Sequence, residues 1–129
     1  MTMQELSVIL KEAGVVGAGG AGFPSYAKLN DKADTIILNC AECEPLLKLH
    51  RQVLEYHAEE IVFALDEVAK AMGAENVIIA VKPHYKDAIE ASKKAMEGKN
   101  ARFCDIIPLS LEEIFIYEMK GAGYNYEID

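Results

Sequence analysis

The stretch Asp34-Thr-Ile-Ile-Leu-Asn39 is a compact apolar run suited to a strand that is covered on both faces. Residues 77–81, Val-Ile-Ile-Ala-Val, predict a second buried strand, and residues 102–107 predict a third that is less uniformly apolar and therefore nearer an edge. Helices are expected over about 50–72 and 84–96. Strands and helices thus alternate, which predicts an α/β fold: a three-layer Rossmann-like domain whose short, mainly parallel sheet of three to four strands is flanked by helices.

The long helix before the second strand has the clearest helical pattern in the chain. Its apolar residues are spaced alternately four and three positions apart, and Gly73 is expected to end the helix. They are Leu54, Ala58, Ile61, Leu65, Val68 and Met72.

Shorter helices are expected at both ends of the chain. Thr2 and Glu5 have capping-box spacing before an apolar stripe of Leu6, Ile9, Leu10 and Ala13, and Gly14 then ends that helix. Pro24 is placed to open a short helix through Leu29, and residues 110–120 predict a last helix. We expect one domain over residues 1–129, with 121–129 a loose tail.

The composition narrows the classes of function. The chain has 129 residues and a net charge of −8, which disfavours a nucleic-acid partner because phosphate binding needs a basic face. It holds no apolar stretch near the roughly 20 residues of a membrane span, and no basic leader, so a cytoplasmic protein is expected. Three cysteines, an odd number, indicate thiols rather than disulfides.

A glycine-rich run lies between the first helix and the first strand. Gly17, Gly19, Gly20 and Gly22 precede Phe23 and Pro24, and Lys28 follows. Without Cβ atoms, such backbone can approach a phosphate or a ring closely, and a lysine supplies a compact cation. The spacing matches the dinucleotide fingerprint weakly, because no strand precedes it. The alternative is a flexible connecting loop.

A second polar segment, Asn39-Cys-Ala-Glu-Cys-Glu-Pro45, follows the first predicted strand. Open α/β sheets bind ligands where strands end, and the Asn39 amide can both donate and accept. Glu42 and Glu44 can accept hydrogen bonds from ribityl or ribose hydroxyls, and the alternative is a solvated acidic turn. Cys40 and Cys43 leave three interpretations open: a metal site, a redox pair, or a thiol packed beneath the loop.

The two segments together resemble the FMN-binding domain shared by the flavoprotein subunit of respiratory complex I and the C subunit of the Rnf electron-transport complex. GVVGAGGAGFPSYAKL is similar to that family's glycine-rich loop, and LNCAECEP to its second flavin-and-NADH segment. The resemblance covers about residues 10–107 and is strongest to the proteins similar to the Rnf C subunit that are associated with proline reductase.

The resemblance implies a set of site residues and partners. It places Gly17, Gly19, Gly20 and Gly22 around FMN, with Lys28 and Asn39 beside it. It places Glu42 near flavin and NADH, Glu44 near the nicotinamide, and Phe23 at the adenine end of the dinucleotide. The implied reaction is hydride transfer from NADH to FMN, followed by electron transfer to iron–sulfur clusters on other subunits or domains, peripheral to a membrane complex.

Two departures from the family pattern suggest an alternative function. After Pro108 the family's glycine-containing turn is missing, and its further domains, including the cluster-binding one, are absent from the sequence. The alternative to an electron-transfer domain is therefore a shortened, non-catalytic paralogue that serves as an assembly or docking module.

Overall fold

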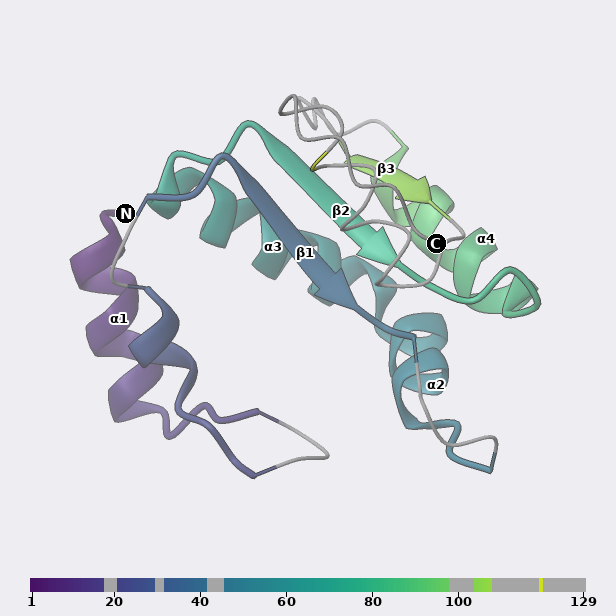
Figure 1. The fold of residues 1–129 in the computed structure, drawn as a ribbon, viewed down its shortest axis with the longest axis horizontal. Coiled ribbons are helices and arrows are strands. Elements are labelled where there is room, and N and C mark those ends of the chain that lie inside the picture. The colour runs from purple at the N-terminus through teal and green to yellow at the C-terminus, as the bar shows by residue number, and fades with distance from the viewer. Residues whose placement is uncertain (18–20, 30–31, 42–45, 98–103, 108–118, 120–129) are drawn as a thin grey trace.

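A parallel three-stranded sheet forms the centre of the computed structural model, which describes residues 1–17, 21–29, 32–41, 46–97, 104–107 and 119 (Figure 1). Its strands are β1 (Thr35–Asn39), β2 (Asn76–Ala80) and β3 (Cys104–Ile107), in the order β1-β2-β3. Thr35 is in register with Asn76, and Val77 with Cys104. The α/β class and the parallel sheet are thus confirmed.

Two helices, α3 (Ala58–Met72) and α4 (Lys86–Met96), cover one face of this sheet and lie behind the strands in Figure 1. Helix α2 (Leu49–Tyr56) lies past the carboxyl end of β1 and packs against α4 and α3. Two successive right-handed crossovers in the same direction, as in the order β1-β2-β3, place their helices on the same face. Helices α3 and α4 therefore form one layer beside the sheet, and the third layer stays a prediction.

The hydrophobic core lies between these helices and β2. Leu54 of α2, Val62 of α3 and Ile79 of β2 are buried in one cluster, and Val81 directly after β2 joins them. As the central strand of the three, β2 is buried on both faces from Ile78 onward. The prediction of a buried second strand is confirmed.

The prediction that the first strand is covered on both faces was wrong. Leu38 packs against the core, but Ile37 on the opposite face is 38% exposed. The physical reason is position: β1 pairs only with β2 within the described residues, so it lies at an edge of the sheet. An apolar composition does not distinguish an edge strand from a central one.

The single helix expected over 50–72 is two helices that meet at His57. That residue leaves helical geometry with φ −128° and ψ 30°, while its N–H still donates to the Val53 carbonyl. Its Nδ1 lies 3.5 Å from the Glu60 carboxylate. The pKa of Glu60 is lowered first by a hydrogen bond from its own backbone N–H and then by this contact with His57. Neither glycine nor proline marks the break, and Leu54 and Ala58 on either side share one core.

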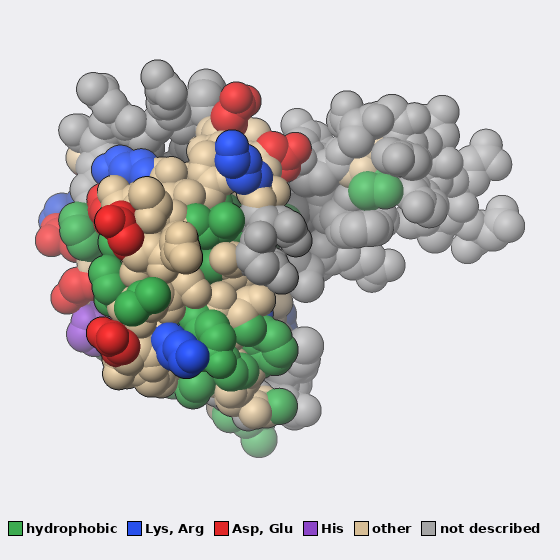
Figure 2. Space-filling model, turned by 90° about the vertical axis from the view of Figure 1, so that its left-hand side faces the viewer, with side chains coloured by type: hydrophobic (Ala, Val, Ile, Leu, Met, Phe, Trp, Pro, Cys, Tyr) green, Lys and Arg blue, Asp and Glu red, His purple; other side chains and the backbone are tan. Residues whose placement is uncertain are grey.

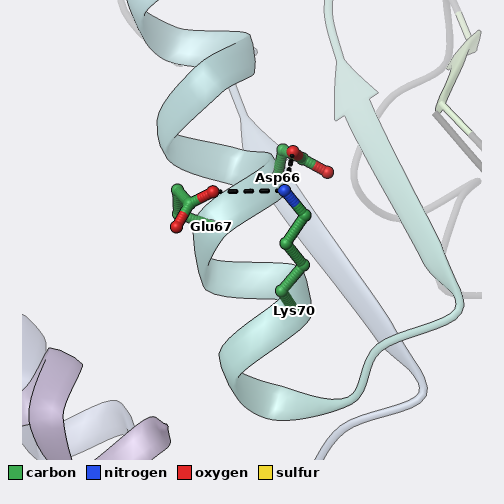
Figure 3. Close-up of polar contacts among 3 residues, drawn as sticks. All are labelled: Asp66, Glu67 and Lys70. Carbon is green, nitrogen blue, oxygen red and sulfur yellow. Dashed lines mark hydrogen bonds and ion pairs between the residues drawn. The ribbon is translucent and has the colours of Figure 1, made fainter. Parts of the chain in front are cut away.

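The end of α3 follows the sequence expectation. Gly73 adopts the left-handed conformation, with φ +71°, that terminates helices. One turn earlier, Lys70 Nζ lies 2.6 Å from Asp66 and 3.2 Å from Glu67, as Figure 3 shows. These two carboxylates raise the pKa of Lys70. A cation in the last turn also complements the helix dipole.

The N-terminal arm consists of α1 (Met3–Glu12) and the 3-10 helix η1 (Ser25–Lys28), which pack against each other. The predicted capping box is present: the Glu5 N–H donates to Thr2 Oγ1 at 3.2 Å, and the Thr2 N–H donates to Glu5 Oε2 at 2.7 Å. The arm reaches the rest of the protein through contacts between α1 and α3.

The apolar stripe expected on α1 is only partly buried. Leu6 is buried, but Ile9 is 52% exposed, and so is the neighbouring Val8 at 50%. Figure 2 shows hydrophobic side chains on the surface of the face that carries this arm. Among the described elements, α1 packs mainly against η1 and α3, which leaves part of its apolar stripe uncovered. None of the helices in the described ranges is long and apolar enough to cross a membrane.

The remaining predicted elements are covered only in part. The third strand is described from Cys104 onward, and its edge position is confirmed among the three described strands. The helix expected over 110–120, except Met119, and the tail 121–129 lie outside the described residues.

Candidate functional site

The glycine run is the loop of a short hairpin between α1 and η1. Val16 and Pro24 form an antiparallel bridge. The Gly17 N–H donates to the Phe23 carbonyl at 2.8 Å, and the Ser25 N–H donates to the Val15 carbonyl at 3.0 Å. A helix, and not a strand, therefore precedes the glycine run. In ordinary Rossmann dehydrogenases a strand comes directly before the glycines, so this arrangement agrees with the expectation that the chain is not one of them.

The stem of this hairpin was missed by the sequence analysis. The available signal was two apolar residues, Val15 and Val16, on one side of the glycines, and Phe23-Pro24 on the other. Apolar pairs that flank a glycine-containing loop are a hairpin pattern. The stem fixes the two ends of the loop next to each other.

Gly17 and Gly22 have different roles in the hairpin. The N–H of Gly17 is used in the stem, so Gly17 closes the loop instead of offering that amide to a ligand. Gly22 has φ +69°, a left-handed conformation that favours glycine, and a Cβ built there would meet nothing within 4 Å. The backbone at Gly22 is thus open to close approach. Gly19 and Gly20 lie outside the described residues.

Phe23 and Lys28 are brought together by η1. The Lys28 ammonium lies 5.7 Å from the centre of the Phe23 ring, within cation–π range, and both side chains are exposed. A similar contact joins Lys11 of α1 to Tyr26, at 5.5 Å. The arm therefore presents the Lys28 ammonium and the Phe23 ring close to the stem of the glycine loop.

Asn39 is the last residue of β1, at the carboxyl end of the strand as predicted. Its Oδ1 accepts a hydrogen bond from the Ala41 N–H at 3.0 Å, which turns the chain away from the sheet. The next residue, Cys40, extends the ladder by donating its N–H to the Ala80 carbonyl at 2.8 Å. Asn39 is exposed, and its amide group carries a donor nitrogen in addition to the oxygen used in this turn.

Lys28 and Asn39 come from separate units, η1 and β1. In Figure 1 η1 lies beside α1 at the left of the molecule, whereas the carboxyl end of β1 points to the lower right toward α2, so the two units are apart in this view. Glu42 and Glu44, the acidic members of the predicted site, lie outside the described residues. Their contribution and the closure of the site remain predictions.

The cysteines divide between the core and regions that the structure does not describe. Cys40 is buried at 6% exposure within the core cluster, which agrees with the interpretation of a thiol packed beneath the loop. Cys43 lies outside the described residues. Within the described ranges no three His, Cys, Asp or Glu side chains are grouped so that they could hold a metal ion.

The described residues fit a flavin nucleotide in their chemistry. The left-handed Gly22 leaves space where a side chain would otherwise stand, and Lys28 supplies a cation for a phosphate or an electron-rich ring. Asn39 supplies an amide at the carboxyl edge of the sheet, where α/β folds hold ligands.

Comparison with known families settles the class of domain. Residues 10–124 match the family described as the Nuo51 FMN-binding domain, a range that includes both the hairpin and the end of β1. The chain belongs to this family. The predicted resemblance to the FMN-binding domain of complex I and of the Rnf C subunit is confirmed.

Two curated relatives show which kinds of protein contain a region similar to this chain. It is 46% identical over 82 residues to cobalamin reductase PduS of Citrobacter freundii, covering 64% of the chain and 18% of that protein. It is 34% identical over 129 residues to the C subunit of the proton-translocating ferredoxin:NAD(+) oxidoreductase complex of Clostridium ljungdahlii, covering 94% of the chain and 28% of the relative. The chain thus spans less than a third of the length of either relative.

The fold also resembles that of a solved structure. A chain of the air-oxidized NAD+-reducing [NiFe]-hydrogenase superposes with a TM-score of 0.66 at 22% identity, covering 81% of this chain and 20% of that one. At this identity the similarity concerns the fold. It supports the α/β assignment for the FMN-binding domain.

Proposed function

We propose that this chain is the FMN-binding electron-transfer domain of an NADH-linked oxidoreductase. The family match over residues 10–124 carries the proposal, because that range holds the glycine hairpin and the carboxyl end of β1 together. The reaction is hydride transfer from NADH to FMN, followed by electron transfer to an acceptor. Bound FMN supplies the conversion of a two-electron donor into one-electron steps, while the protein positions it and sets its charge environment.

The residues divide this work by chemistry. Gly22, Gly19 and Gly20 provide backbone without side chains along the flavin, and Gly17 closes the loop that carries them. Lys28 provides positive charge, and Asn39 an amide at its polar edge. In this proposal Glu42 lies near flavin and NADH, Glu44 near the nicotinamide, and Phe23 at the adenine end of the dinucleotide.

The partners are inferred from the assembly to which a relative belongs. Since the second relative is one subunit of a complex, we assign the electron-transfer steps after the flavin to other subunits or domains that carry iron–sulfur clusters. The second relative belongs to a proton-translocating complex, and we place this domain at the periphery of a similar membrane assembly. We also expect an additional layer on the second face of the sheet, which completes the three-layer arrangement.

A docking module is the second candidate function. The exposed Val8 and Ile9 of α1, together with Val15 and Val16 of the hairpin, give the N-terminal arm an apolar surface that favours protein contact. In that function the arm would bind a partner whether or not FMN is present. Flavin binding by the full chain distinguishes the two functions, because the electron-transfer domain requires it and the docking module does not.

A flavin titration of the full chain tests the proposal. We expect the fluorescence of FMN to be quenched saturably by micromolar protein, and the protein purified with the cofactor to absorb in the visible flavin bands. Riboflavin, which lacks the phosphate, is the matched comparison. Full FMN fluorescence at saturating protein, with a folded chain by circular dichroism, would exclude flavin binding and favour the docking module.

A further inference from the structure

A pocket lies outside the proposed flavin site, between α2 and the start of α4. Its volume is about 330 Å³, within the range of small-molecule sites. Helix α2 follows β1 along the chain and α4 follows β2, so the pocket is at the edge of the sheet where parallel strands end. None of its lining residues belongs to the glycine hairpin or to the segment after Asn39.

Three permanent cations line this pocket although the protein carries a net charge of −8. They are Lys48, directly before α2, Arg51 of α2 and Lys86 of α4. Glu55 and Asp87 also line it. Within the described part of the chain, however, no ion pair of 4.0 Å or less joins any of the three cations to a carboxylate. The described carboxylates thus do not pair directly with these cations.

Arg51 is held in place by a buried aromatic ring. Its guanidinium carbon lies 4.9 Å from the ring centre of Tyr85, which is only 7% exposed. His84 packs edge-on against the same ring, with 4.5 Å between ring centres. A planar guanidinium that is already stacked loses less freedom when it binds an oxyanion than an unrestrained side chain does. The pocket is thus partly organised before any ligand binds.

The two carboxylates make the pocket more selective than a simple anion site. Lys48, Arg51 and Lys86 suit phosphate oxygens, whereas Glu55 and Asp87 suit hydroxyl donors and repel a second anion. Phosphate and vicinal hydroxyls occur together in a nucleotide, and the pocket volume leaves room for more than the phosphate. We infer that this pocket binds a nucleoside monophosphate, or the equivalent part of a larger nucleotide, with its phosphate at Arg51.

The experiment titrates AMP into the full chain with FMN present at saturation, so that the flavin site does not compete. The ring protons of His84 report on the pocket, since the other two histidines, His50 and His57, do not line it. We expect a saturable shift of the His84 signals with AMP, and a much weaker one with adenosine, which lacks the phosphate.

Substitutions of the lining residues test whether AMP binds in this pocket. Arg51→Gln and, separately, Lys86→Gln should weaken AMP binding by about tenfold, as expected for loss of a charge-assisted contact. Lys93→Gln, an exposed substitution near the end of the same helix and outside the pocket, should change it less than twofold. Equal affinity in Arg51→Gln, Lys86→Gln and the parent chain would overturn the assignment, and circular dichroism checks that each variant is folded.

Three further ligands test the class of ligand. Ribose 5-phosphate should bind more tightly than inorganic phosphate, because it adds the hydroxyls that the carboxylates accept. The nucleotide assignment would be overturned if inorganic phosphate bound as tightly as AMP. It would also be overturned if ATP or AMP at millimolar concentration failed to shift the His84 signals. The readout is independent of flavin binding, since a chain that fails to bind FMN can be titrated in the same way.

Discussion

The N–H of Gly17 donates a 2.8 Å hydrogen bond to the carbonyl of Phe23, and this bond joins the two ends of the glycine loop. The loop therefore begins and ends at a fixed point on the N-terminal arm. Within it, Gly22 is left-handed at φ +69°, whereas Gly17 lies outside the left-handed region. The two glycines are consequently expected to respond differently to substitution.

Gly22→Ala should destabilise the hairpin by about 1–2 kcal/mol, because a residue with a Cβ is strained in the left-handed region. We expect FMN affinity to fall by about tenfold, which corresponds to 1.4 kcal/mol. Gly17→Ala is the matched control, since its Cβ would lie 3.7 Å from Phe23 N and O, an ordinary contact. Urea unfolding and FMN fluorescence measure the two effects. Equal behaviour of both variants would contradict the distinction.

Lys28→Gln should weaken FMN binding by about tenfold through loss of a charge-assisted contact to the phosphate or the ring. Lys11→Gln serves as the control, because Lys11 makes a comparable contact with Tyr26 on the same arm. A fluorescence titration in low and high salt provides the readout. If both lysine variants lose the same affinity, the effect comes from the general charge of the arm and not from a site at Lys28.

Leu54→Ala should lower the free energy of unfolding by about 2–5 kcal/mol, since Leu54 is fully buried where α2 meets the core. Leu46→Ala removes the same atoms from a side chain that is 92% exposed, and should change stability by less than about 0.5 kcal/mol. Chemical denaturation of the two variants gives the comparison. A small loss in Leu54→Ala would mean that α2 is not part of the cooperative unit.

The order of α1 should depend on pH through Glu5. Hydrogen bonds from the backbone and hydroxyl of Thr2 lower the pKa of this carboxyl below its ordinary value of 4.5. The ionised form is therefore favoured in the folded helix, so its stabilising effect is complete above that value and is lost as the pH falls through the lowered pKa. Amide hydrogen exchange of residues 3–6 at decreasing pH should show this loss. Glu5→Gln should remove the pH dependence, and an unchanged profile would refute it.

The order and type of the described elements could be predicted from the sequence because local patterns determined them. The capping box at Thr2 and the left-handed stops at Gly14 and Gly73 are short-range chemistry. The apolar run that became β2 was long and uniform enough to indicate a buried strand. These features required no knowledge of distant parts of the chain.

The misjudged features depend on contacts between distant segments. Ile37 is exposed because β1 is an edge strand, and Ile9 because the described elements leave part of α1 uncovered. No glycine or proline marks the break at His57, and Leu54 and Ala58 on either side of it belong to one core. Apolar character alone does not report such arrangements.

For the candidate site, the sequence predicted where some of the residues lie in the fold, and their roles toward a ligand stay predictions. Asn39 stands at the end of β1, and Lys28 contacts Phe23, at positions that the motifs indicated. The use of the Gly17 amide in a hairpin stem depends on which backbone groups pair across the loop, and the apolar pairs on either side of the glycines were the available signal for that pairing.

The parallel pairing of β1 with β2 has a consequence for how the chain reaches its native state. Thr35 and Asn76 are in register although roughly forty residues separate them, and α2 and α3 lie between them. Closing so long a segment is entropically costly before the strand contacts form, so these helices are expected to gain structure earlier than the sheet. The rate-limiting step of refolding should then be the docking of β1 onto β2, with the core around Leu54 as its nucleus.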